Sequence, residues 1–330
     1  MTKQVKNNII VWGLGNHACK KILPAVFSSK TFTLAGVCSR SEKIVKFYAK
    51  EFSCDGWTDP INMLNTQKIH SVFISTPIAV HFEMAVMSLK ANKNVMCEKP
   101  LTCNFDHTKS LINLAKKNKK MLVEAFMFLY HPQFIRLQNI VNNNELGEIH
   151  SVICRFGIPT LDEPGFRNDA ELCGGALWDV GSYTIAAVLG LFNDQNVEVL
   201  FSEIKKHENS EVDSEGRAIL LFAKGTIAYL EWGTGVSYKN EIDLWADNGS
   251  LYTEKIFSKP KNYLPIYRMR NQFGKESFVD GECADQFIEM FKSFSDVSKS
   301  STKIEVEYER IFRRAKVMDQ ILNFSKYSNN

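Results

Sequence analysis

The stretch that decides the fold is "IIVWGLGNHA", residues 9–18, in which an apolar run ends at a glycine-rich turn. Gly13, Gly15 and Ala18 follow the spacing GxGxxG/A. In that pattern the glycines let the backbone turn sharply and approach a pyrophosphate, whose charge then rests on amide groups at the start of the next helix. An ordinary glycine turn is the alternative. Because the stretch follows a strand, opens a helix and begins a strand–helix series, we favour a dinucleotide site.

The first third of the chain alternates short apolar runs with helical patterns, for example "FTLAGVC" followed by "SEKIVKFYAKEF". Strand and helix in this order predict a parallel sheet covered by helices. After about residue 123, strand patterns joined by tight turns, as at "AKGT" and "ADNGS", predict an antiparallel sheet. The predicted fold class is therefore α/β. We expect residues 1–123 to form a Rossmann domain with a doubly wound parallel sheet, and residues 124–330 to form a second domain with a mainly antiparallel sheet.

The composition of the 330-residue chain is that of an ordinary globular protein, with 45% hydrophobic and 23% charged residues. The formal net charge is +3 and the basic residues are scattered, so neither nucleic acid nor a membrane surface is expected as a partner. No apolar stretch is long enough to span a bilayer, and the N-terminus lacks a signal-peptide pattern, so we expect a cytoplasmic protein. The eight cysteines show no CxxC pair, so we expect reduced core thiols rather than disulfides or a metal site.

The end of the second predicted strand bears on the choice of cofactor. An NAD site usually places Asp or Glu there to bind the ribose diol, whereas this chain has "GVCSR", ending in Ser39 and Arg40. A hydroxyl and a planar cation suit a 2′-phosphate. A surface arginine at a strand end is the plainer interpretation. We expect NADP(H) as the preferred cofactor, with NAD(H) as the other possibility.

A second candidate motif is "GGALWDVGSY", residues 174–183, which places Asp179 and Tyr183 four residues apart. In the structural interpretation, Asp179 suits the positive end of a helix and Tyr183 packs inward. In the catalytic interpretation, the carboxylate and the phenol share one helix face and point into one cleft. The stretch alone favours the structural interpretation.

The stretch "STPIAVHFEMAVMSLKANKNVMCEKPLT", residues 75–102, makes a family resemblance specific. One strand ends in Thr76-Pro77, and the next closes on Glu98-Lys99-Pro100. This arrangement resembles the Gfo/Idh/MocA family, which includes glucose-fructose oxidoreductase and inositol dehydrogenases. "EAFMFLYHPQF", "LGEIHSV" and "GGALWDVGSY" are similar to that family in the same order, so the resemblance spans nearly the whole chain.

The resemblance implies a Rossmann domain followed by an α/β domain whose open sheet often forms a dimer interface. It also implies that Lys99 and Asp179 face the nicotinamide and the substrate. Many members carry His at the position of Tyr183, whereas the branch resembling glucose-fructose oxidoreductase, dihydrodiol dehydrogenase and sugar ketoreductases carries Tyr. Ile78 departs from the family pattern, where Asn is frequent, so no polar contact to the cofactor is expected there.

These observations define the expected site. A nearby ammonium favours the phenolate of a tyrosine and makes proton exchange practicable. We therefore expect Tyr183 to donate a proton, Lys99 to stabilise charge, and Asp179 to orient a substrate hydroxyl or the lysine. The residues expected at the cofactor are Gly13, Gly15, Asn16, His17, Ala18, Ser39, Arg40, Ser75, Thr76, Pro77, His81, Glu98 and Lys99. Those expected at the substrate are Arg155, Arg167 and Trp178.

The expected function is hydride transfer between NADP(H) and a sugar-like ketone or alcohol, with a keto group on a nucleotide-linked deoxysugar as the preferred specific substrate. Dehydrogenation of a free aldose or a trans-dihydrodiol is the alternative among enzymes. A dinucleotide-binding sensor without turnover is the alternative of another class. The resemblance also favours a homo-oligomer, a dimer in the simplest case, formed through the C-terminal sheet.

Overall fold

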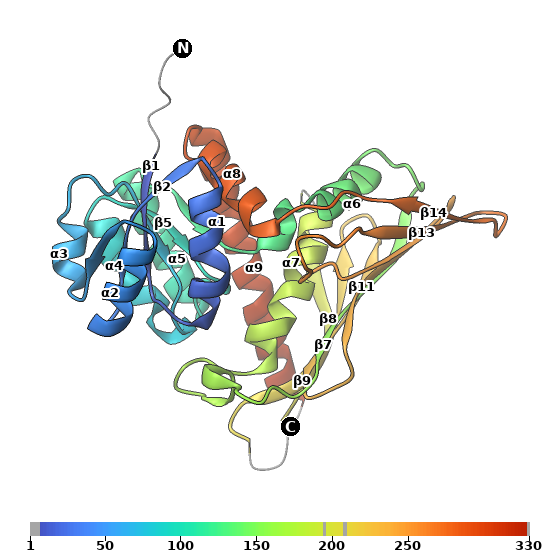
Figure 1. Ribbon diagram of the computed structural model, residues 1–330. Coiled ribbons are helices and arrows are strands. Elements are labelled where there is room, and N and C mark those ends of the chain that lie inside the picture. The colour runs from blue at the N-terminus through green and yellow to red at the C-terminus, as the bar shows by residue number, and fades with distance from the viewer. Residues whose placement is uncertain (1–6, 194–195, 207–209, 329–330) are drawn as a thin grey trace. The chain divides into compact units, whose positions relative to one another are not determined.

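The computed structural model describes residues 7–193, 196–206 and 210–328 (Figure 1). The chain divides into two compact units. Unit 1 comprises Met1–Ala125 and Phe287–Phe312, and unit 2 comprises Phe126–Gln286 and Arg313–Asn330. The sequence-based boundary differs from this division because the segment 287–312 belongs to unit 1 and not to the second domain.

Unit 1 is built on a six-stranded parallel sheet. In chain order its strands are β1 (Asn7–Trp12), β2 (Phe32–Cys38), β3 (Asp55–Trp57), β4 (Ser71–Ile74), β5 (Asn94–Cys97) and β6 (Leu122–Glu124). Their order in the sheet is β3-β2-β1-β4-β5-β6, which confirms the predicted doubly wound arrangement.

Helices pack on both faces of this sheet (Figure 1). They are the π-helical turn η1 (Ala18–Ile22), α1 (Leu23–Ser28), α2 (Glu42–Glu51), α3 (Pro60–Leu64), the short turn η2 (Ile78–Val80), α4 (His81–Lys90), α5 (Phe105–Asn118), α8 (Gln286–Val297) and the first part of α9 (Ser301–Ser328). The ring of Phe291 on α8 contacts the rings of Phe32 and Phe73 on the strands. This apolar contact explains why a segment so late in the chain belongs to unit 1.

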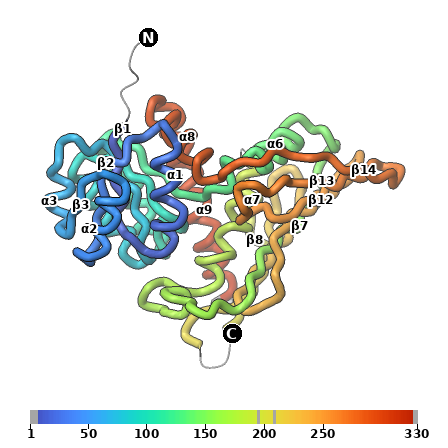
Figure 2. Tube along the Cα trace, in the orientation of Figure 1, coloured from blue at the N-terminus to red at the C-terminus, as the bar shows by residue number. Residues whose placement is uncertain are grey.

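Unit 2 is built on an eight-stranded sheet, and Figure 2 traces its successive strands. The strands are β7 (Ile149–Ile158), β8 (Val197–Lys206), β9 (Asp213–Phe222), β10 (Ile227–Thr234), β11 (Lys239–Ala246), β12 (Gly249–Glu254), β13 (Ile266–Asn271) and β14 (Glu276–Asp280). Their order is β14-β13-β12-β11-β7-β10-β9-β8, and every pair is antiparallel except β7 with β10. The prediction of an open, mainly antiparallel sheet is confirmed.

One face of the unit 2 sheet carries the core. The helical segments of this unit are η3 (Met127–Tyr130), α6 (Pro132–Asn142), η4 (Gly165–Asn168), the π-helical turn η5 (Leu177–Gly181), α7 (Ser182–Leu191) and the rest of α9. Val152, Cys154 and Phe156 on β7 are buried in one cluster with residues of α6 and α7. The residues between them along β7, such as Arg155, point to the opposite face, which we call the outer face of the sheet.

The cysteines follow the sequence expectation in part. The expectation of reduced core thiols agrees with Cys38, Cys97 and Cys154, which are free and buried. Cys19 and Cys54 are free but only half-buried, and Cys283 is free and exposed, so it is not a core residue. The expectation is wrong for Cys103 and Cys173, which are disulfide-bonded, because the spacing of cysteines along a chain does not by itself predict their oxidation state. Over the described ranges, no group of three or more His, Cys, Asp or Glu side chains could hold a metal ion. No helix within those same ranges is long and apolar enough to cross a membrane.

Candidate functional site

The turn after β1 has the geometry that a dinucleotide requires. Gly13 has a φ of 105°, and its N–H donates to the carbonyl of Cys38 at 2.9 Å. A Cβ at Gly13 would lie 2.2 Å from the carbonyl oxygen of Ser75, so only glycine fits there. A Cβ at Gly15 would have no heavy atom within 4 Å. The exposed backbone at Gly15, just before the helix that starts at Ala18, therefore fits the close approach of a pyrophosphate.

The end of β2 presents a hydroxyl and a cation. Ser39 is half-buried, its N–H donates to the carbonyl of Trp57, and its hydroxyl accepts from the N–H of Ser41 at 3.5 Å. Arg40 is exposed, and within the described ranges no ion pair joins it to a carboxylate. A cation without a carboxylate partner at this strand end is what a ribose 2′-phosphate requires.

His81 ties together the loops that follow β4 and β5. Its Nε2 lies 2.8 Å from the carbonyl oxygen of Thr76, and its Nδ1 lies 3.1 Å from that of Pro100. The ring is fully buried, and burial lowers the pKa of His81, although the carbonyl contacts favour its cationic form. His81 thus acts on the expected pocket by holding the backbone beside Thr76 and Lys99 in place.

Glu98 lies among basic side chains beside the glycine-rich turn. The Nε2 of His17 lies 3.2 Å from the Oε1 of Glu98. Burial by itself raises the pKa of the Glu98 carboxyl, but His17, Lys99 and His81 outweigh it and hold that pKa below its ordinary value. Glu98 is therefore a carboxylate at neutral pH, and it links the turn after β1 to the strand end that carries Lys99.

Unit 1 gathers the residues expected at the cofactor along one edge of its sheet. They follow the carboxyl ends of β1, β2, β4 and β5, where ligands bind in doubly wound folds. Gly15, Asn16 and His17 are exposed, Thr76, Pro77, Glu98 and Lys99 are half-buried, and Ser75 and Ala18 are buried.

In unit 2 the structure brings Arg167 and Asp179 together. The Nε of Arg167 donates to the Oδ2 of Asp179 at 2.6 Å, and Asp179 is only 7% exposed. The guanidinium also lies 5.0 Å from the centre of the Phe166 ring. Trp178, next to Asp179 on η5, is partly buried against the core. The Asp179 carboxylate is thus buried and paired with Arg167, and it is not a solvent-exposed charge at the end of a helix.

Tyr183 is enclosed by aromatic side chains at the start of α7. Its ring contacts four others at centroid distances of 5.3 to 5.8 Å, those of Phe126, Phe128, Phe156 and Phe257. Its hydroxyl donates to the sulfur of Met127 at 3.7 Å. The ring is therefore fixed by packing, which leaves the hydroxyl in a defined position. The sequence analysis did not identify these aromatics, although the pattern "EAFMFLY" contains two of them.

Asp213 is a residue of this region that the sequence analysis missed. It opens β9, and its Oδ2 accepts from the N–H of Leu177 at 2.7 Å, at the start of η5. Gly175 has a φ of 113°, and a Cβ there would lie 2.2 Å from the Oδ1 of Asp213. Burial raises the pKa of Asp213 to about 6. Nothing in the sequence around Asp213 signals this contact, because it joins segments 36 residues apart.

Arg155 and Tyr183 lie on opposite faces of the unit 2 sheet. It lies on the outer face of the sheet, whereas its neighbour Phe156 contacts the Tyr183 ring on the core face. Its guanidinium is held by Glu231 and, at 3.1 Å, by Glu241. Successive strand residues point to opposite faces, so the Arg155 side chain lies on the face opposite Tyr183. The expectation that Arg155 contacts the substrate beside Tyr183 is therefore not supported by its position.

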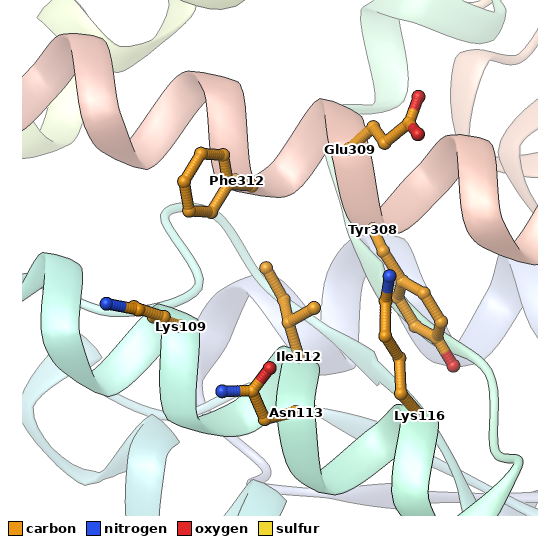
Figure 3. Close-up of a pocket in the computed structure, with 7 residues that line it drawn as sticks. All are labelled: Lys109, Ile112, Asn113, Lys116, Tyr308, Glu309 and Phe312. Atoms are coloured by element: carbon orange, nitrogen blue, oxygen red, sulfur yellow. The ribbon is translucent and has the colours of Figure 1, made fainter.

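A pocket of about 280 Å³ in unit 1 is a separate feature (Figure 3). It lies between two helices and is lined by Lys109, Ile112, Asn113 and Lys116 from α5 and by Tyr308, Glu309 and Phe312 from α9. None of the residues expected at the cofactor or the substrate lines it, so we do not assign the site to it.

Comparison with known proteins identifies a dinucleotide-binding domain and a distinct C-terminal domain. Residues 7–126 match the Gfo/Idh/MocA model described as an oxidoreductase family with an NAD-binding Rossmann fold, and residues 134–252 match the model of the Gfo/Idh/MocA C-terminal domain. A dTDP-3,4-didehydro-2,6-dideoxy-alpha-D-glucose 3-reductase of Actinomadura kijaniata is 28% identical, over 94% of this chain and 93% of the relative. A trans-1,2-dihydrobenzene-1,2-diol dehydrogenase of Xenopus laevis is 26% identical, over 59% of each chain. The crystal structure of a 3-ketoreductase from Actinomadura kijaniata, in complex with NADP and TDP-benzene, is 25% identical, with 97% of this chain and 98% of that chain covered and a TM-score of 0.89.

Proposed function

Because the chain belongs to the Gfo/Idh/MocA family of oxidoreductases, we propose that it reduces the keto group of a nucleotide-linked deoxysugar with NADPH. The observation that carries this proposal is the assembly of Gly15, Arg40 and Lys99 along one edge of the unit 1 sheet. The similarity to a dTDP-sugar 3-reductase over nearly the full length of both chains supports the choice of substrate.

Several residues would hold the cofactor in this proposal. The backbone at Gly15 and the start of η1 would bind the pyrophosphate, and Ser39 with Arg40 would bind the 2′-phosphate. The loops tied by His81 would border the nicotinamide. When bound there, NADPH would supply the hydride that the reduction requires.

The side chains of the protein then donate one proton to the carbonyl oxygen and stabilise the negative charge that develops there. As the carbonyl π electrons move onto oxygen, the Tyr183 hydroxyl donates its proton to that oxygen, and solvent later reprotonates the phenolate. The family resemblance gives Lys99 the role of stabilising negative charge at the reacting oxygen of the substrate. Asp179, held by Arg167, accepts a hydrogen bond from a substrate hydroxyl and so orients the sugar. We therefore propose that Arg167 acts through Asp179 and not as a separate phosphate-binding residue.

The test compares wild type with Tyr183→Phe and Lys99→Ala in NADPH oxidation with a panel of dTDP-keto-sugars, free aldoses and trans-dihydrodiols. Tyr229→Phe on the outer face and Lys109→Ala on α5 are matched controls. We expect kcat to fall about 100- to 10,000-fold in the two site variants and to stay unchanged in the controls. Equal turnover by all five proteins would refute the proposed site.

The substrate panel separates the alternatives. Turnover of free aldoses or trans-dihydrodiols in preference to nucleotide-linked sugars would favour the dehydrogenase alternative, which the similarity to a dihydrodiol dehydrogenase supports. NADPH binding without turnover of any substrate would favour the sensor.

We also propose that two copies associate through the outer face of the unit 2 sheet. Trp245 on β11 and Tyr229 on β10 are 63% and 40% exposed there. Glu241 on the same face is almost buried, and it accepts hydrogen bonds from Arg155, Lys239 and Tyr252. Large exposed aromatics around a neutralised polar cluster are typical of an interface.

A further inference from the structure

We propose that Asp213 is a positioning residue, which from β9 fixes the start of η5 and thereby the direction in which Asp179 and Tyr183 point. The catalytic meaning of this inference rests on the proposed function. The positioning itself does not, because it concerns contacts within unit 2.

The first contact lies at the N-terminal end of η5. The carboxylate of Asp213 accepts from the N–H of Leu177 at 2.7 Å, two residues before Asp179. Gly175 makes this approach possible, since its φ of 113° and its missing Cβ leave room for the Oδ1 of Asp213. Gly174 is equally constrained, because a Cβ there would lie 2.4 Å from the carbonyl oxygen of Arg167. The glycine pair that opens the motif thus lets Asp213 and the Arg167 loop approach the start of η5 closely.

The second contact lies at the C-terminal end of η5 and involves the neighbouring strand. A Cβ at Gly181 would lie 3.0 Å from the ring of Trp232 on β10, so η5 packs directly on that ring. Trp232 pairs in register with Gly216 on β9, the strand that Asp213 opens. The strands β9 and β10 therefore hold η5 at both ends. Asp179 lies between the two contacts, and Tyr183 lies two residues after the second.

The charges around Asp213 favour its role as an anionic cap. Lys206, its register partner on β8, lowers the pKa of the carboxyl, as do the N–H groups of Leu177 and Ala176. Burial opposes them and is the larger effect, so the pKa of Asp213 is raised to about 6. Above that pH the carboxylate faces the N–H groups that start η5, where negative charge is favourable.

The positioning is tested by hydrogen exchange, which needs no substrate. Asp213→Ala removes the acceptor, and Asp213→Asn keeps one acceptor oxygen but removes the charge. Asp169 supplies the control, since its Oδ1 caps the N–H groups of Glu171 and Leu172 in the loop before η5. We expect amide exchange in the peptide covering 174–183 to quicken at least tenfold in Asp213→Ala, less in Asp213→Asn, and not in Asp169→Ala. Unchanged exchange in Asp213→Ala, in a protein that still binds NADPH, would overturn the proposal.

The catalytic consequence is tested separately. We expect Asp213→Ala to lower kcat about 10- to 100-fold, because a small displacement of reacting groups costs that much, while the Kd for NADPH stays within about twofold of wild type. Wild-type kcat should fall below about pH 6, and Asp213→Asn should lack that ionisation. If Asp213→Ala fails to fold, Asp213→Asn decides: wild-type exchange together with a wild-type pH profile refutes the role. Quickened exchange in an enzyme whose Tyr183→Phe variant keeps full activity would instead reject the proposed function and leave the positioning intact.

Discussion

Replacement of Gly13 by alanine should lower the stability of the fold, whereas replacement of Gly15 should lower the affinity for NADPH. At Gly13 a Cβ would lie 2.2 Å from the carbonyl oxygen of Ser75, and φ is 105°. The backbone conformation costs an L-residue about 1–2 kcal/mol, and relief of the overlap costs about 1–3 kcal/mol more. At Gly15 the new methyl group would have no protein atom within 4 Å. Gly13→Ala should therefore lose about 2–5 kcal/mol of folding free energy, whereas Gly15→Ala should lose none.

The two variants should also differ in cofactor binding. The methyl group of Gly15→Ala would stand where a pyrophosphate must approach the backbone, so the Kd for NADPH should rise at least about tenfold, or about 1.4 kcal/mol. Thermal unfolding without cofactor should show a Tm lower by roughly 5–15 °C for Gly13→Ala only. Fluorescence titration with NADPH should show the loss of affinity in the stable variant, Gly15→Ala. Wild-type affinity in Gly15→Ala would contradict the placement of the pyrophosphate, and wild-type stability in Gly13→Ala would contradict the close approach of the β1 turn to Ser75.

Three further outcomes are expected. Arg40→Ala should raise the KM for NADPH about 10- to 100-fold and leave the KM for NADH unchanged, because only NADPH carries the 2′-phosphate; steady-state kinetics with both cofactors checks this. Burial lowers the pKa of Lys259 to about 7 from 10.5, so between these values the unfolded chain holds a proton that the folded chain has lost. Stability in chemical denaturation should therefore rise with pH across that range, and Lys259→Met should remove this dependence on pH. Trp245→Lys should shift the protein towards monomers in sedimentation velocity, whereas an unchanged mass would reject the outer face as the interface.

Local patterns were enough to predict the architecture. A buried parallel strand such as β4 is a short apolar run, "SVFI", between turn residues, and all four of its side chains are buried. The hairpins of unit 2 are equally local, since "ADNGS" joins β11 to β12 with its glycine at the first position of β12. The residues expected at the cofactor share one edge of the sheet for the same reason. Each lies in the segment after a strand or at the start of the helix that follows it, and parallel strands bring their carboxyl ends together.

The contacts that the sequence did not reveal are those between distant segments. Phe291 packs against Phe32 and Phe73, and no periodicity links them. Arg155 shows the sensitivity of a strand to register. Along β7, a shift of one residue would turn its guanidinium from the outer face to the core, and the sequence pattern did not establish which face is covered by helices.

Asp179 illustrates how both early interpretations of one residue can be incomplete. From the sequence, the Asp179 side chain is either a charge at the end of a helix or one member of a catalytic pair with Tyr183. In the structure the N–H of Leu177 is capped by Asp213, while Asp179 accepts from Arg167 instead. Burying two charges offsets most of their attraction, so the ion pair with Arg167 adds little stability, but it fixes the orientation of the Asp179 carboxylate, which is 7% exposed. Because Asp213 caps the start of η5, Asp179 is not needed for that cap, and a fixed carboxylate one helical turn from Tyr183 fits the proposed orientation of a substrate hydroxyl.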